Sequence, residues 1–263
     1  MKFVKPKVFL IASTWVDAVK IHEWLRYLGA PDWKTDAATD AELLIELAGR
    51  RCYKAFGTDL NPNLSKVREG NEGYIDNILK SKHGSVLEHA HVTFAIENVT
   101  RVFTHEIVRH RLCNFSQESL RFVRPTSLDA YFPDVYTEHL DESDAARVKA
   151  VFVDAFESLE AFQRVLIRIC GMDKEGLAFG IKKLIQSANR RLMPIGMSTG
   201  IIVTSNHRNW RHLIEMRTAA FSEEEIRIVF LQIAKDLQSM FPAIYQDMVI
   251  GDDNAVTFEH GRV

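Results

Sequence analysis

Two hydrophobic periods alternate irregularly along this chain of 263 residues. Strand-like patterns occupy Lys7–Ser13, a stretch in which Val92, Phe94 and Ile96 alternate with less apolar residues, and Gly200–Ser205. The βαβ units of a doubly wound sheet require strands and helices that alternate regularly. The strand-like patterns of this chain do not alternate regularly with its helical patterns. We therefore predict the α+β class.

Helical spacing of apolar residues, with suitable start and stop signals, marks the remaining elements. The predicted helices are Asp40–Tyr53, Glu72–His83 with Gly84 as its cap, Thr100–Leu112, Asp141–Cys170, Asn206–Ala219 and Glu223–Met240. The polar segment after Gly251 is a candidate for disorder.

Composition and charge narrow the class of protein. With 46% hydrophobic and 26% charged residues, the chain can bury a core, and we predict one domain over residues 1–263. The net charge of −2 gives no support for a nucleic-acid or membrane partner. Cys52, Cys113 and Cys170 are odd in number and widely spaced, which indicates free thiols. Since no stretch approaches the ~18 apolar residues of a membrane span, we predict a cytoplasmic protein.

Basic residues are concentrated in two segments. Five arginines and two histidines between Arg101 and Arg124 face only Glu106 and Glu118. Six lysines and arginines between Lys182 and Ile214 have no acidic neighbour in that segment. Such clusters repel themselves unless an anion binds among them, although a solvated basic face is the common alternative.

Helix geometry distinguishes the arginines of the first segment. At ~100° per residue, Arg101, His105 and Arg109 share a face of the predicted Thr100–Leu112 helix, whereas Arg111 falls far round from Arg109. Either Arg111 extends to solvent, or the helix ends here and the chain wraps around a ligand. The polar segment NFSQES that follows supports the second alternative.

The predicted Asn206–Ala219 helix places Arg217 in the middle of an apolar face formed by Trp210, Leu213 and Ile214. Arg208, Arg211, His212 and Glu215 fall on other sides. A buried arginine is rare unless it is paired. Arg217 therefore either forms a structural ion pair or directs its donors into a binding pocket.

Two other candidate sites have weaker support. Five histidines lie between His83 and His110, but their spacing fits no standard zinc pattern, and we predict no metal. Ser116 and Ser119 have no nearby base that would make either of them a nucleophile. Hydroxyl groups beside arginines more often hold a phosphate. A nucleotide enzyme and a non-catalytic nucleotide sensor or RNA-binding module both remain compatible with these residues.

At this point the motifs resemble those of flavin-dependent thymidylate synthases. The hallmark is Arg-His-Arg, seven residues and then Ser, found here as Arg109, His110, Arg111 and Ser119. Similar flanking segments follow in family order from His83 to Arg217: HGSVLEHAHVTF, TRVFTHEIVRHR, SQESLRF, ANRRLMP and TSNHRNWRHLIEMR. The chain departs from the family pattern at Asn114, Phe122 and Phe221, where serine, tyrosine and histidine are common.

The resemblance implies a fold and a reaction. The fold is a curved, mostly antiparallel sheet flanked by helices, assembled as a homotetramer with active sites at subunit interfaces. The reaction is the reductive methylation of dUMP to dTMP. Methylenetetrahydrofolate donates the carbon, and FAD that is reduced by NADPH supplies the hydride.

The resemblance also implies the roles of individual residues. Seven positions match flavin contacts: His83, Ser85, Arg109, His110, Arg111, Asn206 and His212. Six match positions that hold dUMP, the last three near its phosphate: Arg101, Glu106, Gln117, Ser119, Arg121 and Arg190. Arg217 matches the arginine that contacts the pyrimidine and is the predicted catalytic residue.

Overall fold

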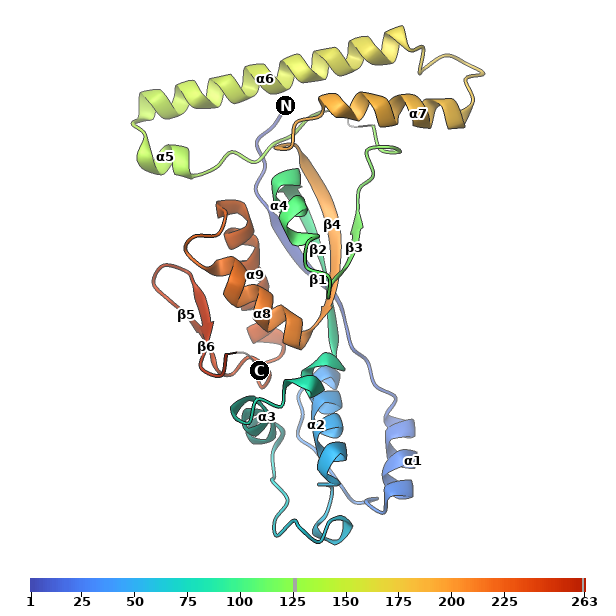
Figure 1. The fold of residues 1–263 in the computed structure, drawn as a ribbon, viewed down its shortest axis with the longest axis vertical. Helices are drawn as coiled ribbons and strands as arrows, with labels where there is room; N and C mark the ends of the chain where they lie inside the picture. Colours follow the sequence, from blue (N-terminus) through green and yellow to red (C-terminus); the bar gives the residue numbers. More distant parts are fainter. Residues whose placement is uncertain (125–126, 262) are drawn as a thin grey trace. The chain divides into compact units, whose positions relative to one another are not determined.

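The computed structural model describes residues 1–124, 127–261 and 263. Its strands and helices are mixed as predicted, which confirms the α+β class (Figure 1). The strands are β1 Lys7–Ser13, β2 His91–Thr100, β3 Asn114–Gln117, β4 Ser198–Asn206, β5 Met248–Ile250 and β6 Val256–Phe258. A four-stranded sheet has the order β1-β2-β4-β3, and β5 pairs with β6 in an antiparallel hairpin.

Nine α-helices and three short 3-10 helices lie within the described residues. The α-helices are α1 Ala18–Leu28, α2 Asp40–Tyr53, α3 Asn71–Lys80, α4 Arg101–Ile107, α5 Val135–His139, α6 Glu142–Ile169, α7 Phe179–Asn189, α8 His207–Thr218 and α9 Glu224–Met240. The 3-10 helices are η1 Thr58–Leu60, η2 Gly84–Glu88 and η3 Arg190–Leu192. Within the part of the chain that the structure describes, no helix is both long and apolar enough to cross a membrane.

The chain packs into two compact units. Unit 1 comprises Met1–Phe9, Ala95–Arg111 and Phe115–Val203; unit 2 comprises Leu10–Phe94, Leu112–Asn114 and Thr204–Val263. The prediction of one domain over the whole chain stays a prediction.

Unit 1 has a small core beside its longest helix. Leu120, Leu128, Ala130, Phe156 and Met197 form a buried cluster there, and Phe156 belongs to α6. The side chain of Asp141 caps the first turn of α6, as the acidic start of that segment predicts.

Unit 2 contains a core in which α8 packs against α9. Trp210 is fully buried, lies 5.2 Å from the ring of Phe94 edge to face, and donates its indole N–H to the carbonyl oxygen of Val92. Asn206 caps α8 by accepting the N–H of Asn209 at 2.8 Å. The orientation of α8 is therefore fixed by an apolar face and by a cap.

Three predicted boundaries differ from the structure. The third helix ends at Lys80, and Gly84 instead begins η2, packed so closely against Val263 and Arg208 that a Cβ would collide with them. The predicted Thr100–Leu112 helix ends at Ile107. The segment after Gly251, a candidate for disorder, contains β6, whose residues Val256 and Phe258 are buried in unit 2.

Candidate functional site

A positively charged cluster lies in unit 1 where α4 begins. Arg101 donates to the carbonyl oxygen of Glu118 at 3.1 Å, but its Nε is buried and has no hydrogen-bond partner among the described residues. Burial lowers the pKa of Arg101, the nearby carboxylate of Glu118 opposes this effect, and the charge of Arg190 lowers the pKa further. Arg101 and Arg190 are therefore close enough to repel one another.

Two acidic residues adjoin this cluster. Burial raises the pKa of Glu97, and the charge of Glu118 raises it further. Thr199 donates its hydroxyl to Glu118 at 3.3 Å, and a Cβ on Gly200 would collide with the Glu97 carboxylate. The site thus combines an unsatisfied buried donor on Arg101 with a second arginine, Arg190, that repels it, and such a pair favours a bound anion.

The predicted substrate residues of unit 1 follow from this cluster along β3. The side-chain amide of Gln117 donates to the buried Thr104 hydroxyl at 2.9 Å, which holds it against α4. Ser119 begins a tight turn in which its carbonyl oxygen accepts the N–H groups of Phe122 and Val123. Its hydroxyl oxygen accepts the N–H of Arg121 at 3.4 Å, and the Arg121 side chain is exposed.

The Arg109–Arg111 motif lies outside any regular helix. Val108 forms the C-cap of α4, and the N–H of His110 bonds to the carbonyl oxygen of Ile107. Arg109 and Arg111 are exposed, and His110 is half-buried. The helix therefore ends before this motif, as one alternative predicts, and Arg111 is exposed, as the other predicts; that the chain wraps around a ligand here stays a prediction. Glu106, on the last turn of α4, is half-buried.

Unit 2 contains a cavity of about 350 Å³ at the start of α8. Asn206 and His212 line it together with Arg208 and Glu88, which form an ion pair. Because the side-chain oxygen of Asn206 caps the helix, its amide NH2 is the group that can donate to a ligand. Two of the predicted flavin contacts are thus brought together.

His83 lines a different cavity of unit 2, with a volume of about 720 Å³, beside Tyr53 and Arg68. The His83 Nδ1 atom is buried and has no hydrogen-bond partner among the described residues. Ser85 is exposed on η2, next to Gly84, which packs against Arg208. The amide, imidazole and guanidinium groups of these residues fit the phosphate and carbonyl groups of a flavin dinucleotide, and the unsatisfied His83 nitrogen supports that fit.

One expectation about α8 is wrong. Arg217 is half-buried in the last turn, whereas Arg211, which we placed on another side, is the buried arginine with 4% exposure. Arg211 pairs with Asp247 through two bonds of 2.7 and 2.8 Å and stacks 4.0 Å from the centre of the Phe258 ring. Burial alone would raise the pKa of Asp247, but hydrogen bonds and the charge of Arg211 lower it overall.

Comparison with known proteins shows the family to which the chain belongs. The family model described as thymidylate synthase complementing protein matches residues 35–243. The chain belongs to this family.

Similar individual proteins agree with the family. A flavin-dependent thymidylate synthase from Mycobacterium sp. (strain JLS) is 34% identical over 83% of this chain and 84% of its own length. A probable flavin-dependent thymidylate synthase from Mycobacterium phage D29 is 35% identical over 92% of this chain and 96% of its own. The UMP/dUMP methylase PolB from Streptomyces cacaoi, solved with 5-Br dUMP, has a TM-score of 0.62 at 21% identity, covers 94% of this chain and 96% of its own, and shares the fold.

Proposed function

We infer that this chain is a flavin-dependent thymidylate synthase, a methyltransferase that converts dUMP to dTMP. Methylenetetrahydrofolate donates the carbon, and NADPH is the reductant. When bound, FAD supplies the hydride chemistry. The match of the family model to residues 35–243 is the observation that carries this conclusion.

We propose that the positively charged cluster of unit 1 holds the dUMP phosphate. Support comes from the unsatisfied Nε of Arg101 and from the repulsion between Arg101 and Arg190, which a phosphate would relieve. Ser119 and Arg121 complete the phosphate site in this proposal, while Glu106 and Gln117 contact the rest of the nucleotide. Ser119 acts as a positioning hydroxyl and not as a nucleophile.

The remaining predicted residues are proposed to serve the flavin and the pyrimidine. The flavin contacts are His83, Ser85, Arg109, His110, Arg111, Asn206 and His212. Arg217 is proposed to contact the pyrimidine. Carbon–carbon bond formation at uracil C5 moves electron density onto a ring carbonyl, and a guanidinium held there stabilises that charge by roughly 3 kcal/mol.

The assembly and the location of the enzyme are also proposals. A homotetramer with active sites at subunit interfaces follows from the family resemblance. Exposed apolar side chains on α6 and α7, including Ile169 and Phe179, support an assembled state. The three free cysteines support a reducing compartment such as the cytoplasm.

Two measurements on the purified protein test the enzymatic function. We expect a yellow preparation that absorbs near ~450 nm, as protein-bound flavins do. We also expect release of tritium from dUMP labelled at C5 when methylenetetrahydrofolate and NADPH are present. A colourless preparation that takes up no added FAD and releases no tritium would contradict the proposed function.

A further inference from the structure

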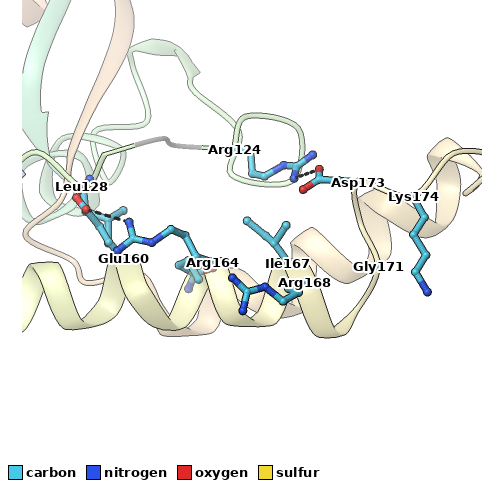
Figure 2. A pocket seen from close by; sticks show the side chains of 10 residues that line it. Arg124, Leu128, Glu160, Arg164, Ile167, Arg168, Gly171, Asp173 and Lys174 are labelled. Atoms are coloured by element: carbon cyan, nitrogen blue, oxygen red, sulfur yellow. Dashed lines mark hydrogen bonds and ion pairs between the residues drawn. The ribbon is translucent and has the colours of Figure 1, made fainter.

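A second basic cavity, of about 900 Å³, lies in unit 1 along the C-terminal half of α6 (Figure 2). Arg164, Ile167 and Arg168 reach it from α6, and Arg124 faces them from the other side. Leu128, Glu160, Asp173 and Lys174 are among the other lining residues. No residue predicted to bind dUMP or flavin lines this cavity.

Positive charge is in excess there. Four basic side chains line the cavity against two carboxylates. Asp173 pairs with Arg124 at 2.8 Å, and Glu160 lies 3.6 Å from Arg164. Glu160 is also engaged by the backbone N–H of Leu128 and by the amino terminus, so it neutralises Arg164 only in part. No ion pair of Arg168 is found among the described residues.

The arrangement of the basic groups indicates the shape of the ligand. Arg164 and Arg168 are one helical turn apart, about 6 Å along α6, and Arg124 lies opposite. Donors to a single phosphate converge on one point, whereas these basic groups form a row. Among the described lining residues none is aromatic, so there is no ring on which a purine or pterin could stack. A flexible aliphatic chain that carries several carboxylates fits this row.

The cavity adjoins the proposed substrate segment. Arg124 follows Arg121 by three residues, and the turn that Ser119 begins connects them. The opposite side of α6 is different in character, because Val151, Phe162, Val165 and Ile169 fall within about 60° of one another there at ~100° per residue. An interface built on that apolar stripe would leave the cavity open.

We propose that this cavity binds the γ-glutamyl tail of the folate cosubstrate. The proposal rests on the proposed function, which supplies the folate. Each γ-linked glutamate carries one α-carboxylate on a flexible aliphatic chain, and successive carboxylates pair with Arg124, Arg164 and Arg168. Bidentate pairing with guanidinium groups suits these carboxylates, and the apolar side chains of Leu128 and Ile167 contact the methylene groups.

The first test compares methylenetetrahydrofolate bearing one glutamate with the same compound bearing five. For the unmodified enzyme we expect a KM at least about tenfold lower with five glutamates, which corresponds to about 1.4 kcal/mol. The double variant Arg164→Gln/Arg168→Gln is expected to lose this preference while its KM for dUMP stays the same. The control Arg147→Gln removes an exposed charge near the start of α6 and should retain the preference. An active unmodified enzyme without the preference, or a double variant that keeps it, would overturn the proposal.

The second test measures binding without catalysis. The probe is p-aminobenzoyl-pentaglutamate, which lacks the pterin, titrated into the flavin-loaded protein by calorimetry. We expect saturable binding that weakens in the double variant and at high salt. Absence of binding would overturn the proposal even if dTMP is formed, whereas binding by a protein that forms no dTMP would refute the proposed function alone. A double variant with a raised KM for NADPH and an unchanged glutamate preference would assign the cavity to the 2′-phosphate of NADPH.

Discussion

Arg211 and Arg217 lie on the same helix and occupy different environments. Helical periodicity places Arg217 on the apolar side of α8 and Arg211 on another side. Periodicity does not indicate that Arg211 is the buried arginine, because its burial depends on two residues that are distant in sequence, Asp247 in the loop before β5 and Phe258 in β6. The half-buried position of Arg217 in the last turn of the helix suits a group that must reach a ligand.

We predict that replacing Arg217 with alanine lowers turnover strongly. Loss of one donor aimed at developing charge costs roughly 3 kcal/mol of barrier, or a factor of about 10² in kcat. The fold and the flavin absorbance are expected to persist, because the α8 core does not include this side chain. Single-turnover measurements of dTMP formation, with flavin content as the control, test this. A variant with near-normal turnover would exclude the catalytic role.

Arg211 is expected to matter for stability. Replacing it with leucine leaves the buried carboxylate of Asp247 without its ion-pair partner, which costs about 3–5 kcal/mol of unfolding free energy. Arg208→Leu, on the same helix, breaks an exposed pair with Glu88 and should cost less than about 1 kcal/mol. Urea unfolding of the flavin-free proteins measures both values. Equal values for the two variants would refute a special role of the buried pair.

At the scale of elements, hydrophobic period predicts the main segments well. The bounds of β1 and α2 agree with the sequence prediction, and α6 and α9 agree within one residue at each end. The helices α1 and α7 were not predicted. Both have a helical period of apolar residues at least as clear as that of the predicted helices, so the sequence does carry a signal for them, and both expose large apolar side chains such as Tyr27 on α1 and Leu184 on α7. Helix α4 ends earlier than predicted because the chain turns after Ile107, and hydrophobic periodicity carries no information about such a turn.

The start of α8 is expected to make stability depend on pH. His207 is fully buried, and burial lowers its pKa to about 3, assisted by the charges of His91 and Arg211. Its Nδ1 is 3.0 Å from the hydroxyl of Tyr245. In the unfolded chain the pKa returns to ~6.5, so the unfolded state binds a proton that the folded state does not. Above pH ~6.5 His207 is neutral in both states and does not lower the unfolding free energy. As the pH falls from there toward the folded-state pKa, the unfolding free energy decreases, because only the unfolded state binds the proton.

Between pH ~4 and ~6 the unfolding free energy of the unmodified protein should fall by about 1.4 kcal/mol per pH unit through this group. His207→Gln should lose that part of the slope, whereas His22→Gln, at an exposed position of α1, should keep it. Unfolding by urea at a series of pH values measures the slope. Identical slopes for the unmodified protein and His207→Gln would contradict the assignment to His207.

At the scale of the whole molecule, the even charge total conceals local excess. The net charge of −2 coexists with a basic cluster around Arg101 and Arg190 and with the basic cavity beside α6. Uneven distribution along the sequence predicts the two basic segments that supply Arg101 and Arg190, but not that the fold brings these two arginines together. It could not predict the basic cavity, because Arg124 is separated by about 40 residues from Arg164 and Arg168 and the fold brings them together. Local sequence thus locates a site only where its residues are consecutive or share a helix face.

Assembly is the whole-molecule property for which the surface makes the clearest prediction. In the apolar stripe of α6, the exposed fractions of Phe162 and Ile169 are 56% and 75%. Such exposure of neighbouring large apolar side chains is unusual for a surface that stays in water. We expect the unmodified protein to have a solution mass of about four times the 30.1 kDa of one chain, and Ile169→Glu to reduce it. Light scattering during size-exclusion chromatography measures both. Arg164→Glu introduces the same carboxylate side chain, with a larger change in net charge, on the cavity side of α6, and it should leave the mass unchanged because that side faces away from the stripe. If Ile169→Glu also leaves it unchanged, another surface must hold the subunits together; if the unmodified protein is monomeric, the tetramer itself is excluded.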